Sequence, residues 1–129
     1  MDVRQFKVED HQEIAEWWRK REWDVIPLEA LPVTGVVFEG DTNICAAWLY
    51  TTGTAFGWLE WIVTNPEAGL KQRGEAVPKA IEALKGMALA CGVKLIFNGS
   101  KSGGLIKSME KQGFQKTDTE MTHMVWRAQ

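Results

Sequence analysis

The chain has 129 residues, of which 45% are apolar and 25% are charged, so it can bury one core and shows no compositional sign of disorder. Its formal net charge is -2 and its pI about 5.7, which excludes a global positive field that would draw it to nucleic acid or to an anionic membrane surface. We therefore expect a single domain over residues 1–129, with no nucleic-acid partner and no membrane partner.

The cysteines and the first residues bear on the compartment. Cys45 and Cys91 belong to no C-x-x-C pair and to no spaced Cys/His set, so we expect reduced thiols and no metal site. The chain starts without a basic segment followed by an apolar one, and nowhere do about 18 uncharged apolar residues run together. These features predict a cytoplasmic protein.

The first third of the chain predicts a strand, a helix and a loop. Residues 4–8 alternate polar and apolar side chains, as a half-buried strand does. Residues 11–23 carry apolar side chains at helical spacing and predict an amphipathic helix. Pro27 and Pro32 leave room for about one helical turn, so we expect a loop with a short helix between them.

Three β-rich runs follow, and they predict an antiparallel meander. They comprise residues 35–39, 44–51 and 56–64, and each connection between them is rich in turn residues such as glycine, asparagine and threonine. Short polar connections of this kind join neighbouring antiparallel strands.

The second half predicts a helix, a strand, a second helix and a last strand. An apolar stripe at helical spacing runs over residues 77–91 and ends at Gly92. Residues 94–98 read as a short strand, the second helix is closed by Gly113, and residues 114–127 supply the last strand. This order predicts an α/β (α+β) domain with a mixed, mostly antiparallel sheet flanked by helices.

The segment that carries chemistry joins a strand to the longest helix. After residues 58–66 comes a glycine-bearing loop, and residues 71–76, which read KQRGEA, open into the helix. N–H groups in the first turn of a helix have no internal partner and point outward, which favours a phosphate there. Lys71 and Arg73 add positive charge, and Gly74 permits close approach of a ligand.

These residues resemble the GCN5-related N-acetyltransferase (GNAT) family. The pyrophosphate loop of that family reads Gln/Arg-x-x-Gly-x-Gly/Ala, which residues 71–76 match with lysine in first place, and Val63 with Pro66 looks like the preceding strand end. A second segment, residues 109–114, is similar to the family's Tyr-x-Lys-x-Gly-Phe. There Met109 stands where the family often has the tyrosine that protonates the departing thiolate. The resemblance covers almost the whole chain.

The resemblance implies a GNAT-like fold and an enzyme that passes the acetyl group of acetyl-CoA to an amine of a small molecule or a protein, as a monomer or a homodimer. It also implies coenzyme contacts at Ile62, Val63, Thr64, Lys71, Gln72, Arg73, Gly74, Glu75, Ala76 and Ser102. For Ser102 a helix cap is the competing interpretation. A non-catalytic CoA-binding or structural module on the same fold is the competing function, because the usual tyrosine is absent.

Glu60 is the candidate general base, since several family members carry a glutamate on this strand. Flanking tryptophans could raise its pKa by desolvation, and the alternative is that Glu60 merely pairs with a lysine or arginine across the sheet. Trp23 and Leu28 lie in the region that in the family often lines the acceptor pocket, and we expect them to contact the acceptor.

Overall fold

A computed structural model describes residues 2–128, in which five strands form one sheet in the order β1-β2-β3-β4-β5. Neighbouring strands are antiparallel up to β4, and β5 is parallel to β4. The strands are β1 (Asp2–Gln5), β2 (Gly35–Glu39), β3 (Asn43–Thr51), β4 (Phe56–Thr64) and β5 (Leu95–Phe97). The predicted mixed, mostly antiparallel sheet is therefore confirmed.

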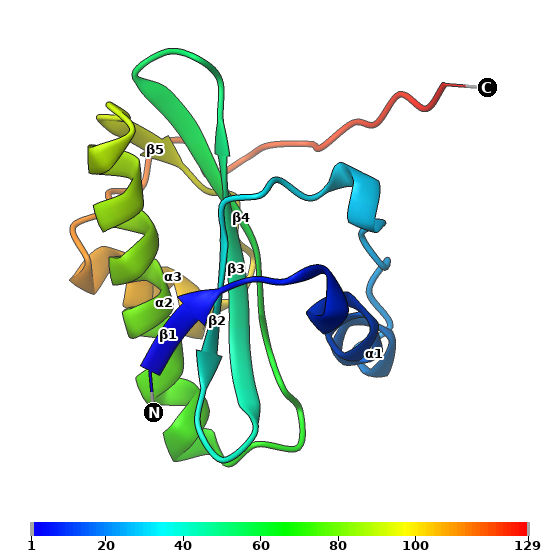
Figure 1. Ribbon diagram of the computed structural model, residues 1–129. Helices are drawn as coiled ribbons and strands as arrows, with labels where there is room; N and C mark the ends of the chain where they lie inside the picture. Colours follow the sequence, from blue (N-terminus) through cyan, green and yellow to red (C-terminus); the bar gives the residue numbers. More distant parts are fainter. Residues whose placement is uncertain (1, 129) are drawn as a thin grey trace.

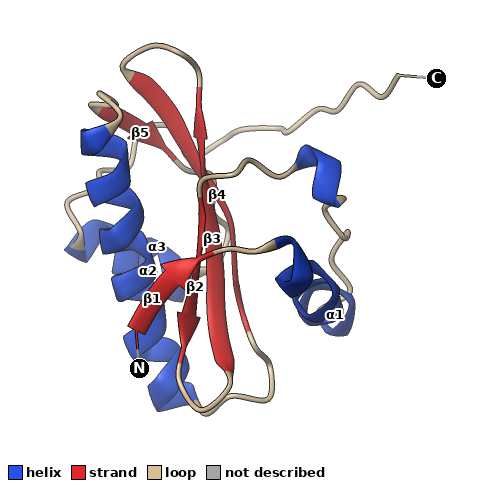
Figure 2. Cartoon of the chain, viewed as in Figure 1, coloured by secondary structure: helices blue, strands red, loops and turns tan. Residues whose placement is uncertain are grey.

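Helices cover both faces of this sheet (Figure 1). The helix α1 (His11–Lys20) lies on one face, and α2 (Leu70–Ala90) and α3 (Gly103–Lys111) lie on the other. Two single-turn helices, η1 (Val8–Asp10) and η2 (Leu28–Ala30), flank α1 in the sequence. Figure 2 shows the resulting three layers, with the sheet in the middle.

Alternation along the central strands divides the buried residues between the two faces. In β2, Val36 and Phe38 pack toward α2, whereas Val37 between them packs toward α1. Trp48, on the α1 face, is the largest fully buried side chain among the described residues, and its ring lies 5.8 Å from the Trp18 ring, centroid to centroid. Both layers thus fix the central strands, and with them the position of β4.

Two predicted boundaries near the N-terminus are wrong. The first strand is β1, which starts earlier than residue 4 and ends at Gln5. The first helix ends at Lys20 and not at residue 23, because Glu22 adopts a φ of 58°, a left-handed conformation that a continuing helix does not allow. Trp23 consequently lies in a loop beyond the helix.

The long helix begins before the KQRGEA segment and not after it. Residues 71–76 form the first turns of α2, and Pro78 lies in the helix interior. A proline removes one helical hydrogen bond, but here the helix is held by burial of Ala76, Ala80 and Ile81 against the sheet. Tertiary packing therefore overrides the local signal that placed the helix start later.

The predicted last strand over residues 114–127 is wrong. Residues 112–128 contain no helix or strand, and Figure 1 shows the last part of this segment running away from the sheet. An alternating pattern becomes a strand only where another strand pairs with it, and β5 offers an edge of only three residues. Among residues 2–128, none of the helices is both long and apolar enough to cross a membrane.

Candidate functional site

The outer edge of β4 is free of a neighbouring strand over its second half. The strand β5 pairs with β4 only from Phe56 to Trp58, and then the two strands part. At the point of separation Asn98 Nδ2 donates to the backbone oxygen of Leu59 at 2.7 Å. Within residues 2–128, no strand pairs with this edge from Glu60 to Thr64. This edge can therefore offer backbone groups to a ligand.

A β-bulge interrupts the other edge of β4. Ala46 pairs with Val63, and Trp48 pairs with Glu60. Between these two pairs β4 therefore contains one residue more than β3 does. Trp61 lies in the bulge with a φ of 61°, which is uncommon for a large side chain and costs conformational energy. Bulges re-aim side chains and backbone groups, and this one lies beside Glu60.

The entrance of α2 is exposed and directly follows β4. The first helical hydrogen bond runs from Arg73 N to Gly69 O at 3.0 Å, and Gln72 Oε1 accepts the N–H of Gly69 at 3.4 Å. The N–H groups of Leu70, Lys71 and Gln72 belong to the first turn, which has no internal acceptor for them. All three residues are exposed, so the entrance is open to an anion.

The other residues of the KQRGEA segment lie deeper in the helix than the sequence predicts. Gly74 and Glu75 are exposed on the second turn, and no atom outside the helix backbone lies within 4 Å of the position of a Cβ at Gly74. Ala76 is fully buried in the core. The exposed residues in the first turn of α2 are therefore Leu70, Lys71 and Gln72.

Two arginines meet at the junction of β4 and α2. Arg21 follows α1 and donates from Nη1 to Thr64 O at 2.5 Å and from Nη2 to Thr64 Oγ1 at 2.8 Å. The Nε of Arg73 is buried and has no hydrogen-bond partner. Burial, and next the charge of Arg73, lower the pKa of Arg21. Neither arginine belongs to an ion pair within residues 2–128, so the junction carries uncompensated positive charge.

Glu60 accepts a hydrogen bond from the backbone and does not form, among the described residues, the ion pair with a lysine or arginine that was the alternative interpretation. Its Oε1 accepts the N–H of Gly99 at 3.2 Å, and it forms no ion pair within residues 2–128. Burial raises the pKa of Glu60, while the N–H of Gly99 and the charge of His123 act in the opposite direction. A half-buried carboxylate with a raised pKa beside an open strand edge has the properties of a general base.

The structure brings Trp23 to the junction but places Leu28 elsewhere. Arg21 stacks over the Trp23 ring at 5.4 Å from its centroid, and Trp23 is 52% exposed. Leu28 lines a hollow of about 200 Å³ whose other walls come from Gln5, Phe6, Val8, Leu31, Pro32 and Val33. No residue of β4 lines that hollow.

Met109, from the second family segment, and Ser102, before α3, both have contacts within the protein. Met109 is 4% exposed and packs in the core on the α2 side of the sheet. Ser102 caps α3, its Oγ accepting the N–H of Leu105 at 3.4 Å. The helix-cap interpretation of Ser102 therefore describes its observed contact, and a coenzyme contact stays a prediction.

Four residues of the site were missed by sequence reasoning. They are Arg21, Tyr50, Asn98 and His123. Tyr50 accepts the Nε1–H of Trp61 at 2.7 Å and donates to Ala30 O at 2.8 Å. Only Asn98 carried a usable signal, because a polar residue at the end of a parallel strand lies at the sheet edge where ligands bind.

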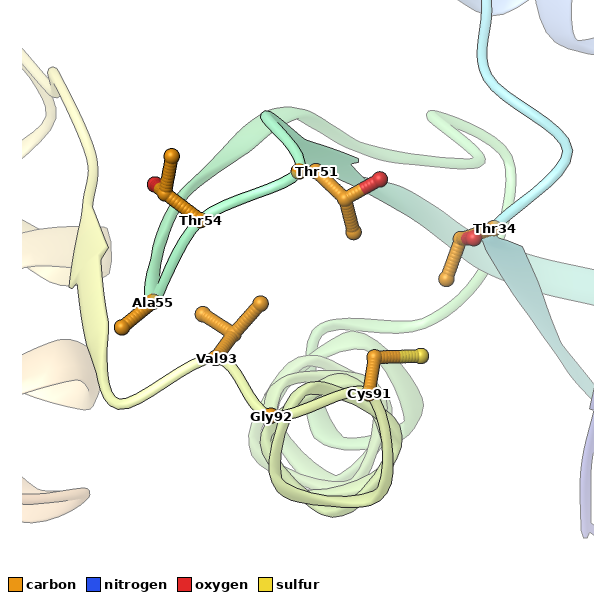
Figure 3. Close-up of a pocket in the computed structure, with 8 residues that line it drawn as sticks. Thr34, Thr51, Thr54, Ala55, Cys91, Gly92 and Val93 are labelled. Carbon is orange, nitrogen blue, oxygen red and sulfur yellow. The ribbon is translucent and has the colours of Figure 1, made fainter.

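A larger hollow lies at the far end of α2. It measures about 530 Å³, and Figure 3 shows its lining residues, which come from the segment after α2, from the end of β3 with the β3–β4 turn, and from Thr34 before β2. Cys91 and Gly92 in its wall follow the last residue of a 21-residue helix, so they are roughly 30 Å from the entrance at Leu70. This hollow is therefore separate from the junction described above.

Comparison with known proteins establishes the fold. No family model and no curated protein matches the sequence. Solved structures match over nearly the whole chain: a Thermus thermophilus protein with a TM-score of 0.74, 16% identity and full coverage of both chains, and a Mycobacterium tuberculosis protein in complex with CoA, with a TM-score of 0.73, 14% identity and coverage of 95% of this chain and 76% of that one. Glucosamine-6-phosphate N-acetyltransferase from Arabidopsis thaliana matches with a TM-score of 0.66 and 14% identity over 95% of this chain and 97% of its own.

These likenesses define the class of fold. The chain has the fold of the GCN5-related N-acetyltransferases, in a single copy that spans nearly all of it.

Proposed function

We propose that the chain is an acetyl-CoA-dependent N-acetyltransferase that acts on the primary amine of a small molecule or a protein. The observation that carries the proposal is the junction of β4 and α2, where an exposed helix entrance directly follows a strand with a free edge. A ligand with a diphosphate and an amide-bearing arm matches both features. The neighbouring structure that contains CoA supports this choice of ligand.

The diphosphate would bind at the first turn of α2. The N–H groups of Leu70, Lys71 and Gln72 are the donors, and the side chains of Lys71 and Arg73 add charge. Because the whole chain carries a net charge of -2, binding of an anion depends on this local positive charge. Arg21 adds to the same field from the other face of the sheet.

The pantetheine arm would lie along the free edge of β4. Its amides can pair with the backbone of Ile62, Val63 and Thr64 as an added strand would. The thioester would then lie near Trp61, where the backbone is irregular and the outer edge of β4 has no strand partner within residues 2–128. A backbone N–H aimed at the thioester oxygen would stabilise the negative charge that develops there.

The reaction is a direct displacement at the thioester carbon. The amine nitrogen forms a bond to the carbonyl carbon, the C–S bond breaks, and CoA leaves as a thiolate while Glu60 takes the amine proton, directly or through water. The thiol of CoA has a pKa near 8.5, about that of free cysteine. The thiolate can therefore leave without a side chain that donates a proton to it, and it then takes a proton from solvent. The buried Met109 is compatible with this sequence of events, because no step requires a side-chain acid at that position.

The test is release of CoA thiol that depends on both acetyl-CoA and an amine. It is made in Cys91→Ser, because Cys91 is exposed and would react with a thiol reagent, whereas Cys45 is buried and its pKa is raised to about 12. We expect saturable binding of acetyl-CoA by calorimetry and amine-dependent thiol release with members of an amine panel. Absence of binding of both acetyl-CoA and CoA would contradict the proposal.

A non-catalytic CoA-binding module is the second candidate, favoured by the buried Met109 in place of a tyrosine. The two candidates predict the same calorimetric binding but differ in turnover. Binding of acetyl-CoA without thiol release across primary amines and lysine peptides would favour the module. Release that disappears in Glu60→Gln would favour the enzyme.

A further inference from the structure

An aromatic surface lies beside Glu60 on the α1 face of the sheet. Phe56 and Trp58 lie 5.4 Å apart, centroid to centroid, and Phe97 lies 4.8 Å from Phe56 and 5.5 Å from Trp58. Trp58 pairs with Phe97 across β4 and β5, and on its other side it pairs with Tyr50. Residues paired across strands lie on the same face of a sheet. We name Phe56, Trp58 and Phe97 the aromatic wall.

The helix α1 leaves this wall uncovered. It packs on the same face over Trp48 and Val63, which are buried, whereas Trp58 and Phe97 are each 38% exposed. Clustered aromatic rings that stay partly exposed on a folded domain mark a binding surface more often than isolated ones do. The wall therefore has area available for a ligand.

Glu60 lies at the border of this wall with one oxygen committed and one available. It follows Trp58 by two residues on the strand, so both side chains are on the same face, roughly 7 Å apart along β4. Its Oε1 accepts the N–H of Gly99, and Oε2 makes no hydrogen bond within residues 2–128. Tyr50 and Trp61 are linked to each other next to it.

This combination is complementary to one class of molecule. A carboxylate attracts an ammonium group, and the faces of tryptophan and phenylalanine rings attract both cations and aromatic hydrocarbon. An amino sugar would pair with Glu60 but would make no ring contact with the aromatic wall. A neutral aromatic molecule would contact the wall but would leave Glu60 without a cation. Only a cation with an aromatic body uses both parts.

We propose that the acceptor is a primary arylalkylamine, whose ring packs on Trp58 and Phe97 while its amino group lies at Glu60. The proposal rests on the proposed transferase function, because Glu60 is the same group that takes the amine proton. It assigns to the aromatic wall the selection of the acceptor, and to Glu60 the attraction of the ammonium group and the removal of its first proton before attack. The second nitrogen proton passes to solvent as the C–N bond forms, and the CoA thiolate takes one proton from solvent.

Direct binding tests this assignment without acetyl-CoA. The probe is 2-phenylethylamine, compared with 2-phenylethanol, which lacks the charge, and with ethylamine, which lacks the ring. Binding is followed by amide chemical shifts and by calorimetry. We expect 2-phenylethylamine to bind about 10-fold or more tightly than either relative, which corresponds to the contribution of one partly desolvated cation–aromatic or ion-pair contact.

Three variants locate the binding. We expect Trp58→Leu and Phe97→Leu to weaken the binding of 2-phenylethylamine about 5- to 30-fold and to leave the binding of ethylamine unchanged. We expect Glu60→Gln to weaken the binding of both amines and to leave the binding of 2-phenylethanol unchanged. Trp126→Leu is the matched control, because Trp126 is 85% exposed in the C-terminal segment and lies outside the wall. Circular dichroism confirms that each variant is folded.

Equal binding of 2-phenylethylamine and ethylamine to the unaltered chain would overturn the proposal, and this comparison needs no variant. So would unchanged binding in both Trp58→Leu and Phe97→Leu. Acetyl-CoA is titrated separately: if it binds and the arylalkylamine does not, the acceptor class is wrong and the transferase proposal stands. If the arylalkylamine binds and acetyl-CoA does not, the transferase proposal fails while the amine site stands.

Discussion

Arg21 holds Thr64 by two hydrogen bonds, one to its backbone oxygen and one to its hydroxyl. This contact ties the end of α1 to the last residue of β4, across the sheet from α2. Because burial and Arg73 both lower the pKa of Arg21, the cation gains from any anion placed at the junction. Arg21 thus has an observed structural contact with Thr64, and we propose that its charge also contributes to binding of the coenzyme.

Replacing this cation should weaken coenzyme binding. Arg21→Gln can keep one hydrogen bond to Thr64 but loses the positive charge. Arg73→Gln removes the positive charge of a side chain whose Nε has no hydrogen-bond partner among the described residues. For each we expect acetyl-CoA to bind about 10-fold more weakly, as for loss of one charge-assisted contact. Calorimetry measures the change, and Lys7→Gln, an exposed cation after β1, is the matched control. Unaltered affinity in both arginine variants would place the anion elsewhere.

Glu60 predicts a particular pH dependence of turnover. As a base it works when ionised, and because burial raises its pKa the acidic limb of kcat/KM should lie above the ordinary carboxyl range. A nearby positive charge favours the ionised carboxylate, so removing it in His123→Ala should move this limb to higher pH. Tyr50 also lies near Glu60, and burial raises its pKa above the ordinary value.

The control for this pH profile is the other histidine of the chain, His11. His11 contacts the backbone oxygen of Ile26 and not Glu60, so His11→Gln should leave the limb in place. A limb that stays fixed in Glu60→Gln would show that another group titrates.

Much of this fold could be predicted, because its signals are local. Alternation in β2 and the apolar stripe of α2 come from burial on one face, which sequence periodicity records directly. The start of α2 could not be located, because Pro78 resembles a helix start and only packing of Ala76 and Ala80 shows otherwise. The same holds for the last strand, whose pattern had no edge on which to pair.

The candidate site was predictable only in part, for a related reason. Glu60 and Lys71 could be chosen because they lie beside a recognisable strand and helix. Arg21 could not, since its contact with Thr64 joins residues 43 positions apart and depends on how α1 crosses the sheet. His123 likewise reaches Glu60 from a segment without helix or strand.

Gly35 has no space for a side chain. A Cβ on this residue would overlap the indole of Trp48, which is fully buried. We expect Gly35→Ala to lower the free energy of unfolding by about 1–3 kcal/mol through overpacking. Gly86→Ala is the matched control: Gly86 lies within α2 with open space around it, and alanine should stabilise the helix by up to about 1 kcal/mol. Urea unfolding measures both, and equal effects would contradict the packing described.

The ionised carboxylate of Asp10 should make the free energy of unfolding depend on pH in the acid range. The Arg4 guanidinium is the main cause that lowers the pKa of Asp10, through hydrogen bonds of 2.8 Å. A carboxyl whose pKa is lower in the folded state contributes stability above its unfolded pKa, and this is lost as pH falls through the folded value. The difference in unfolding free energy between the unaltered chain and Asp10→Asn should therefore be about 1–3 kcal/mol near neutrality and shrink below about pH 4.

The exposed pair of Arg19 and Glu16 provides the control, since both side chains are more than half exposed. Glu16→Gln should change stability little at any pH. A stability difference between the unaltered chain and Asp10→Asn that grows toward low pH would mean that folding raises the pKa of Asp10, contrary to the contact with Arg4.

Titration of the isotope-labelled chain with acetyl-CoA, followed by backbone amide chemical shifts, tests the proposed coenzyme site most directly. We expect the largest saturable shifts at Leu70, Lys71 and Gln72, together with Ile62–Thr64 on the free edge of β4. Saturable shifts confined to the hollow around Cys91 and Gly92, or no saturable shifts at all, would contradict a coenzyme site at the junction of β4 and α2.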